Sequence, residues 1–393
     1  MRVQGFSAAA VQAGIRYADR LDLGLIFSRT PAVTAAAWTT NTVKAAPILL
    51  GMERLRSGMA QAVLINSGNA NACTGQEGLD LARNTSAMAA RELGIAEDLV
   101  QVASTGVIGQ QLSAEPFARA MPALVAGLSA DGFDDLSRAI MTTDLVAKTA
   151  SAVIEIDGVE VRLLGVAKGS GMIMPDMATM LCFVVTDARI VFPVLNRLVK
   201  EGVEQTFNRI TVDGDTSTND MVLVMANGAA DNAWIDEENP RAVERFGEAL
   251  YAVFKDLALK IVADGEGATK LVTIRVTGAR TEEDALDAAQ TIANSLLVKT
   301  ALFGEDANWG RILAALGRSG AVFNPERIAL HFDDVLLVEN GMAVAEQEAA
   351  ASAVLRQRAF ALSVELGEGM AEAEVYTCDL SYDYVKINAD YRS

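Results

Sequence analysis

The sequence predicts an α/β protein in which sheets and helices form layers. Short apolar, strand-like runs alternate along the chain with amphipathic, helix-like stretches. Loops rich in Gly, Asn and Asp separate many of them. Of the 393 residues, 51% are apolar and 21% are charged, a balance typical of a globular protein with a sizeable core. The length suits one large domain or two medium ones of roughly 100–200 residues each.

In the first half of the chain, we expect strands at 61–65 and 99–103 with a helix at 76–93 between them. A polar loop, Asn66-Ser-Gly-Asn, closes the first strand, and Ser-Thr-Gly at 104–106 ends the second. Residues 153–164 alternate in polarity around Asp157-Gly158, a turn dipeptide that strongly indicates a β-hairpin.

The second half continues the alternation. Further strands are expected at 181–186, 271–277, 328–338 and 372–376, and helices at 192–207, 240–262 and 281–297. Pro240 suits the first turn of its helix, and Thr281 with Asp284 predicts an N-terminal cap on the next one. The 240–262 helix has one apolar face, because these residues recur at three- and four-residue spacing: Val243, Phe246, Leu250, Val253 and Leu257.

Composition excludes several classes of function. A formal net charge of −18 disfavours nucleic-acid and anionic-membrane partners. We find no signal-peptide pattern and no apolar run approaching about 18 residues, so no membrane span is expected. The three cysteines, Cys73, Cys182 and Cys378, are far apart and odd in number. They argue against a disulfide framework and a zinc site, and for a reducing, cytoplasmic location.

The chain contains one histidine, His331, in an alternating, strand-like stretch. A histidine-dependent nucleophilic enzyme would have to use that residue, so another group is the better candidate for a catalytic base. Six loops combine Gly with hydroxyl, amide or acidic residues, which suggests a polar site assembled from loops. These loops span 66–75, 104–109, 168–172, 211–220, 264–270 and 304–310. None matches a phosphate-loop or dinucleotide-binding motif, so no nucleotide fold is expected.

The most informative loop reads Lys168-Gly-Ser-Gly-Met-Ile-Met-Pro-Asp-Met-Ala-Thr-Met-Leu and runs into an apolar strand. A threonine at such a junction, Thr179, can attack the carbonyl group before it and cut the chain. The freed α-amino group, with an ordinary pKa of about 7.7–8.0, can then serve as the base for the threonine hydroxyl. The residues alone leave open the alternative of an ordinary turn before a core strand.

The same stretch resembles the self-cleavage region of the ornithine acetyltransferase family, also called bifunctional glutamate N-acetyltransferase. Other segments resemble that family's motifs in the family's order, from about residue 60 to the end. They are Asn66-Ser-Gly-Asn-Ala-Asn-Ala-Cys-Thr-Gly, Ser104-Thr-Gly-Val-Ile-Gly, Met141-Thr-Thr-Asp, Asp213-Gly-Asp-Thr-Ser-Thr-Asn-Asp, Asp264-Gly-Glu-Gly-Ala-Thr-Lys, Lys299-Thr-Ala-Leu-Phe-Gly-Glu-Asp-Ala-Asn-Trp-Gly-Arg and 376–393. The resemblance implies a fold related to that of the N-terminal-nucleophile aminopeptidases.

The resemblance also implies site residues. It implies cleavage between Ala178 and Thr179 into an α chain of 1–178 and a β chain of 179–393, which would form an α2β2 heterotetramer. Thr179 would be the nucleophile, and Thr105 and Gly106 would form the oxyanion hole. The family's substrate contacts match Thr142, Lys168, Thr179, Glu266, Asn388 and Ser393. Two positions depart from the family's usual residues, with Asp176 in place of Asn and Ser393 in place of Thr.

By this resemblance, Thr179 would carry acetyl from N2-acetylornithine to glutamate by a ping-pong mechanism in arginine biosynthesis. Lys168 would meet an α-carboxylate and Glu266 an ammonium group. No cofactor or metal is expected; acetyl-CoA is a second acetyl donor for some members, and the sequence leaves its use open. Two alternatives stay open: an N-terminal-nucleophile hydrolase that uses water as acceptor, and a non-catalytic binding protein that is never cleaved.

Overall fold

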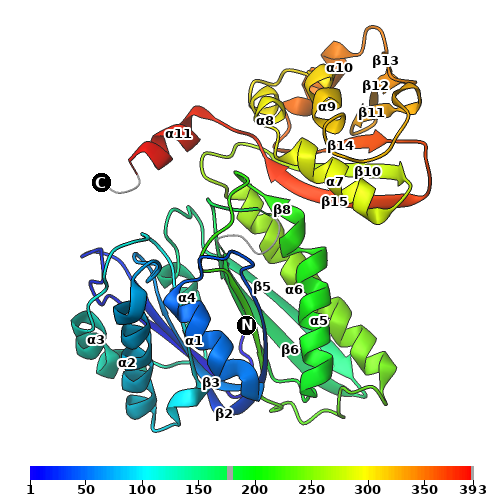
Figure 1. Ribbon diagram of the computed structural model, residues 1–393. Coiled ribbons are helices and arrows are strands. Elements are labelled where there is room, and N and C mark those ends of the chain that lie inside the picture. Colours follow the sequence, from blue (N-terminus) through cyan, green and yellow to red (C-terminus); the bar gives the residue numbers. More distant parts are fainter. Residues whose placement is uncertain (175–179, 391–393) are drawn as a thin grey trace. The chain divides into compact units, whose positions relative to one another are not determined.

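The computed structural model describes residues 1–174 and 180–390. These residues form two compact units, and each unit contains a mixed sheet and its own helices (Figure 1). Unit 1 comprises described residues of Met1–Asn208 and Asp215–Ile261, and unit 2 those of Arg209–Gly214 and Val262–Ser393. The α/β prediction is confirmed. No helix within the described ranges combines the length and apolar character needed to cross a bilayer.

Unit 1 contains a sheet whose strands follow the order β4-β3-β2-β9-β7-β6-β5, with β1 paired to β2. The strands are β1 Phe6–Val11, β2 Leu23–Trp38, β3 Met59–Asn66, β4 Val100–Ser104, β5 Lys148–Ile156, β6 Val159–Lys168, β7 Leu181–Thr186 and β9 Met221–Ala226. β7 runs parallel to β9, whereas its other neighbour, β6, is antiparallel. The order places β7 and β9 in the interior of the sheet.

β7 is apolar along nearly its whole length because both of its faces are buried. On one face, Leu181 and Phe183 belong to a core that also contains Leu223 of β9. On the other, Val184 and Val253 of helix α6 both lie close to the space above Gly165 of β6. Burial on both faces therefore explains why the predicted strand at 181–186 matches the observed one.

The predicted hairpin is confirmed as β5 and β6. Its two turn residues, Asp157 and Gly158, both have positive φ, 49° and 85°. Such a pair is typical of the tight turns whose twist matches that of the flanking strands.

Six helices pack around the unit 1 sheet in the part of the chain described. They are α1 Ala46–Arg54, α2 Gly75–Leu93, α3 Glu115–Ala126, α4 Phe133–Ala139, α5 Phe192–Gln205 and α6 Pro240–Ala263. α5 and α6 approach closely where Gly202 meets the ring of Phe254, and that ring also lies 5.3 Å from the ring of Phe207. The predicted helices at 76–93, 192–207 and 240–262 are thus observed within two residues of their expected ends.

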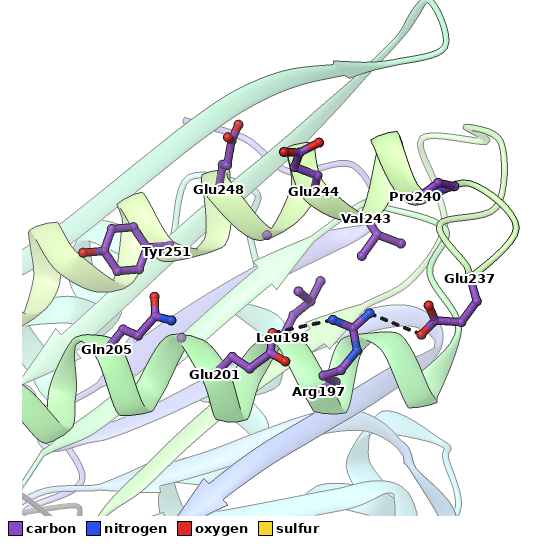
Figure 2. A pocket seen from close by; sticks show the side chains of 12 residues that line it. Arg197, Leu198, Glu201, Gln205, Glu237, Pro240, Val243, Glu244, Glu248 and Tyr251 are labelled. Atoms are coloured by element: carbon purple, nitrogen blue, oxygen red, sulfur yellow. Dashed lines mark hydrogen bonds and ion pairs between the residues drawn. The ribbon is translucent and has the colours of Figure 1, made fainter. Parts of the chain in front are cut away.

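A groove of about 570 Å³ lies between α5 and α6 (Figure 2). Arg197 crosses it, with ion pairs to Glu201 at 3.6 Å and to Glu237 at 3.2 Å. Glu244 and Glu248 add further carboxylates. None of the described residues predicted for the active site lines this groove.

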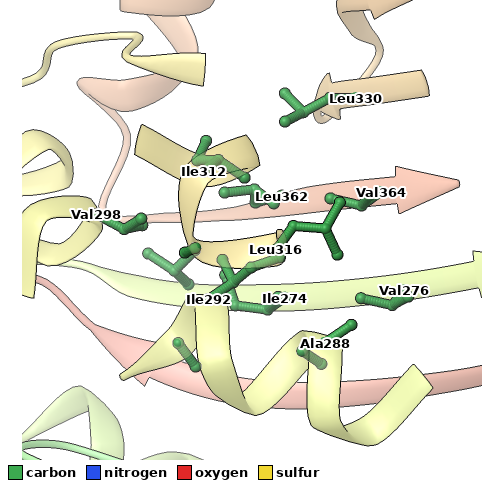
Figure 3. Close-up of a cluster of buried hydrophobic side chains, with 14 of the residues drawn as sticks. Ile274, Val276, Ala288, Ile292, Val298, Ile312, Leu316, Leu330, Leu362 and Val364 are labelled. Atoms are coloured by element: carbon green, nitrogen blue, oxygen red, sulfur yellow. The ribbon is translucent and has the colours of Figure 1, made fainter. Parts of the chain in front are cut away.

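Unit 2 has the strand order β13-β12-β11-β14-β10-β15-β8. Its strands are β8 Ile210–Thr211, β10 Leu271–Ala279, β11 Ala329–Phe332, β12 Val335–Glu339, β13 Met342–Ala343, β14 Ala359–Glu365 and β15 Ala371–Cys378. Its helices are α7 Glu282–Ala293, α8 Leu296–Phe303, α9 Trp309–Leu316, α10 Glu348–Leu355 and α11 Tyr382–Ala389. Ile274 of β10 and Leu362 of β14 share one core with Ile292 of α7 and Leu316 of α9 (Figure 3).

Two boundaries in unit 2 differ from the sequence prediction. The expected strand at 328–338 is a hairpin of β11 and β12, because Asp333 adopts a positive φ of 46° and turns the chain. The helix expected at 281–297 begins as predicted, with the Thr281 hydroxyl accepting from the Asp284 amide at 3.1 Å. It ends at Ala293, and Ser295 caps a separate helix, α8.

Candidate active site

The chain turns sharply after β4, at the predicted oxyanion residues. Gly106 has a φ of +131°, and a Cβ placed there would lie 2.3 Å from the carbonyl carbon of Gly68 and 2.5 Å from the amide nitrogen of Asn69. No side chain fits at that distance, so the close approach of these two backbone segments requires glycine.

Among the residues that the structure describes, this turn offers two hydrogen-bond donors, one hydroxyl and one amide. The Thr105 amide is already used, since it donates to the Asn66 carbonyl at 3.0 Å. The Gly106 amide makes no hydrogen bond to any residue that the structure describes. An oxyanion at this turn would therefore meet the Thr105 hydroxyl and the Gly106 amide, rather than two backbone amides.

Lys168, the last residue of β6, brings three predicted site residues together. Its side chain is buried, and its Nζ donates to the Thr142 hydroxyl at 2.8 Å and to the Thr105 hydroxyl at 3.3 Å. A buried ammonium group requires partners of this kind because desolvation would otherwise disfavour its charge. The cluster thus joins a buried cation to the turn that is predicted to carry the oxyanion donors.

Asp144 organises this cluster, although the sequence did not assign it a role. Its carboxylate accepts from the Thr142 amide at 3.0 Å and the Gly169 amide at 2.7 Å, and lies 2.8 Å from Lys148 Nζ and 3.8 Å from Lys168 Nζ. Burial alone would raise the pKa of Asp144. The two lysine charges and these hydrogen bonds outweigh burial and hold that pKa well below its usual range.

Asp144 therefore stays ionised and fixes the backbone on both sides of the Thr142–Lys168 contact. The motif Met141-Thr-Thr-Asp was the available signal for this residue. No comparable sequence signal exists for Lys148, because a lysine at the start of a strand is most often a solvated surface residue.

Unit 2 contains the other described substrate-contact candidates, Glu266 and Asn388, side by side. Asn388 Nδ2 donates to Glu266 Oε2 at 2.7 Å and to the Tyr384 carbonyl at 3.1 Å. Helix α11 carries Asn388, and Ser381 caps it by accepting from the Asp383 amide at 3.2 Å. Glu266 is mostly buried and ionisable, so it can pair with a cationic group of a ligand.

The remaining predicted residues, Ala178, Thr179 and Ser393, lie outside the described residues. The predicted cleavage boundary between 178 and 179 falls within the sequence of unit 1, between β6 and β7. It is therefore not a boundary between compact units. The prediction of this boundary came from the chemistry of a threonine nucleophile, not from a change in composition.

An α/β fold that gathers a buried lysine, two threonine hydroxyls and a glycine amide at one strand end provides elements that an acyltransferase site requires. The chain belongs to the ArgJ family, whose model matches residues 7–393. Two relatives named arginine biosynthesis bifunctional protein ArgJ match over the full length of both chains. The protein of Desulfotalea psychrophila is 56% identical over 394 residues, and that of Geobacter sulfurreducens is 52% identical over 394 residues.

A solved structure is also similar. The crystal structure of arginine biosynthesis bifunctional protein ArgJ from Bacillus halodurans is 45% identical, with a TM-score of 0.51. The alignment covers 53% of this chain and 97% of that chain. With family membership, this likeness establishes the chain as an acyltransferase of arginine biosynthesis and supports the α/β fold.

Proposed function

We propose that this chain transfers acetyl from N2-acetylornithine to glutamate through an acetyl ester on Thr179. Thr179 becomes an N-terminus when the precursor cleaves itself after Ala178. The observation that carries the proposal is the cluster of Thr105, Thr142 and Lys168 at the end of β6. β6 pairs directly with β7, whose first residue follows Thr179 by two positions.

The cleavage step needs only the threonine and water. The Thr179 hydroxyl oxygen attacks the Ala178 carbonyl carbon, the carbon–nitrogen bond breaks, and the nitrogen takes up a proton. Water then hydrolyses the resulting ester, which leaves a carboxylate on Ala178 and a free amine and hydroxyl on Thr179. The new amine forms only after this cut and then serves as the base in the transfer reaction; the chain's one histidine, His331, lies on β11 of unit 2.

Transfer then proceeds in two half-reactions. The Thr179 oxygen attacks the acetyl carbon of N2-acetylornithine, and its proton passes through the α-amine to the departing ornithine nitrogen. The glutamate amine next attacks the ester, which releases N-acetylglutamate and restores the hydroxyl. In both steps the Thr105 hydroxyl and the Gly106 amide stabilise the negative charge that develops on the acetyl oxygen. Lys168 binds a substrate carboxylate and Glu266 an ammonium group.

The length of the Bacillus halodurans chain supports cleavage. Nearly all of that chain aligns with 53% of this one, so it is little more than half as long. Curated relatives match this chain over the whole length of both. A crystallised polypeptide of half length is expected of a protein that is cut near its middle.

The test is the state of the purified protein. Denaturing electrophoresis with intact-mass measurement should show two pieces, one ending at Ala178 and one starting at Thr179. Thr179→Ala should stay in one piece and be inactive, because it lacks the attacking oxygen, whereas Thr179→Ser should retain part of both activities. Fully active enzyme that runs as one uncut chain would refute the mechanism.

The acceptor and the second donor are tested in separate assays. Ornithine release from N2-acetylornithine should depend on glutamate; release at the same rate without glutamate would indicate a hydrolase. The word bifunctional in the relatives' name favours acetyl-CoA as a second donor for the same site. Formation of N-acetylglutamate from acetyl-CoA and glutamate, lost in Thr179→Ala, would support that activity.

We also infer that the pieces stay together as an α2β2 assembly. Light scattering after gel filtration measures the mass of that assembly.

A further inference from the structure

The loop at 211–220 resembles a family motif but has no role in the mechanism above. Its last two residues, Asn219 and Asp220, lead directly into β9 and are both buried. Buried polar side chains are costly unless they are hydrogen-bonded, so their partners show what these residues do.

Asn219 binds the segment that carries the oxyanion donors. Its Nδ2 donates to the Ser104 carbonyl at 2.8 Å and to the Ala70 carbonyl at 2.7 Å. Ser104 is the last residue of β4 and immediately precedes Thr105. One amide group therefore fixes the strand end before the oxyanion turn to the neighbouring loop.

Asp220 binds the segment that follows the nucleophile. Its Oδ1 accepts from the Met180 amide at 2.8 Å, and the amide of the next residue, Met221, donates back to the Met180 carbonyl at 3.2 Å. Both peptide groups that flank Met180 are thus held by the start of β9. Within the described ranges, Asp220 Oδ2 is buried without a hydrogen-bond partner.

Burial raises the pKa of Asp220, against the opposing effects of the Met180 amide, the Lys168 charge and the Thr39 hydroxyl. A neutral carboxyl group still accepts a hydrogen bond through its carbonyl oxygen. The contact with Met180 therefore does not require a charged side chain.

We propose that Asn219 and Asp220 are positioning residues for the acyl transfer, which act by anchoring Met180 and the strand end at Ser104. The inference rests on the proposed function, because it takes Thr179 as the nucleophile. Two consecutive residues thus hold Met180, which follows Thr179 in sequence, and Ser104, which precedes the oxyanion turn. Acyl transfer depends on such placement, since a misplacement of about 1 Å can cost roughly 10²-fold in rate.

The test follows precursor cleavage in Asp220→Asn and Asp220→Leu. The asparagine variant keeps an oxygen acceptor in a side chain of nearly equal size but cannot ionise. We expect it to cleave within about threefold of the unchanged chain, with the same dependence of rate on pH. The leucine variant leaves the Met180 amide without its acceptor and should cleave roughly 30-fold more slowly or worse. Far-ultraviolet circular dichroism and thermal unfolding establish that each variant is folded.

A folded Asp220→Asn variant that fails to cleave would overturn the inference, because the proton rather than the acceptor would then matter. Cleavage of Asp220→Leu at the original rate would overturn it as well. Should the leucine variant not fold, Asn219→Ala gives the second test. Once its cleavage is complete, the Asn219→Ala variant should have a kcat about tenfold or more below that of the unchanged enzyme. Its KM should stay within about threefold of the unchanged value. An unchanged kcat in that variant would count against the role of Asn219.

The uncleaved Thr179→Ala chain separates this inference from the proposed function. If the unchanged protein never cleaves and resembles Thr179→Ala, the proposed function fails. If the unchanged protein cleaves and Asp220→Leu does so equally fast, only the positioning role fails.

Discussion

Replacing Asp144 by Asn would remove a negative charge from beside two buried lysines, Lys148 and Lys168, at nearly constant side-chain volume. Removing one partner of a buried ion pair typically costs about 3–5 kcal/mol, because a charge is left in a poorly solvated place. The asparagine oxygen can still accept from the amides of Thr142 and Gly169. We therefore expect a loss of about 3 kcal/mol in the free energy of unfolding at pH 7.

The loss should depend on pH with a definite sign. The pKa of Asp144 is lowered in the folded state, so its contribution is complete above the unfolded pKa of about 3.9 and declines as the pH falls toward the folded value. At about 1.4 kcal/mol per pH unit, the difference between the unchanged protein and Asp144→Asn should shrink by about 1 kcal/mol from pH 7 to pH 3.

The assay is urea unfolding in a Thr179→Ala background, which is expected to keep the chain in one piece. A second substitution, Trp309→Phe, removes the tryptophan of unit 2. Tryptophan fluorescence then reports on unit 1 through Trp38 and Trp234. Asp135→Asn is the matched control, because that carboxylate is exposed and should change stability by less than about 0.5 kcal/mol. An Asp144→Asn cost below about 1 kcal/mol, or a difference that grows at low pH, would refute the reasoning.

Three further predictions concern the oxyanion turn and the substrate contacts. Thr105→Val keeps the side chain's shape without its hydroxyl and should lower kcat roughly 10²–10³-fold with little change in KM; a change confined to KM would indicate simple binding. Gly106→Ala should also destabilise the fold, by about 1–3 kcal/mol or more, because its Cβ has no space; thermal unfolding at unchanged midpoint would contradict this. Asn388→Leu removes the amide that donates a hydrogen bond to Glu266 and should raise KM for N2-acetylornithine about tenfold. An unchanged KM would show that Asn388 does not contribute to substrate binding.

Local patterns predicted most elements of the fold. The strand at 181–186 was correct because a run buried on both faces is apolar throughout, and the hairpin at 153–164 because its turn residues have a distinctive chemistry. The run at 328–338 was read as one strand because Asp333 and Asp334 alone do not reveal a turn. Its pairing to β14 is a long-range feature that local sequence does not encode.

The candidate site was predicted through motifs rather than contacts. Thr105, Thr142 and Lys168 were each proposed from the resemblance, and the structure brings them together. The structural roles of Asp144 and Asp220 could not be predicted, since each depends on partners brought close only by folding. Asp220, for example, meets the Met180 amide across 40 positions of sequence.

The order of strands in the unit 1 sheet bears on when the proposed self-cleavage can occur. β7 and β9, which a cut at 178/179 would assign to the second fragment, are inserted between β2 and β6 of the first. Six Cα pairs join β9 to β2, and six more join β7 to β6. The fragments are therefore interlocked, and neither could leave without opening the middle of the sheet. Under the proposed mechanism cleavage would follow folding, because the strand pairs around the site form only when the single chain folds. After denaturation, the cut protein could refold only if its two separate fragments associated. The lifetime of its native state would therefore depend on its unfolding rate.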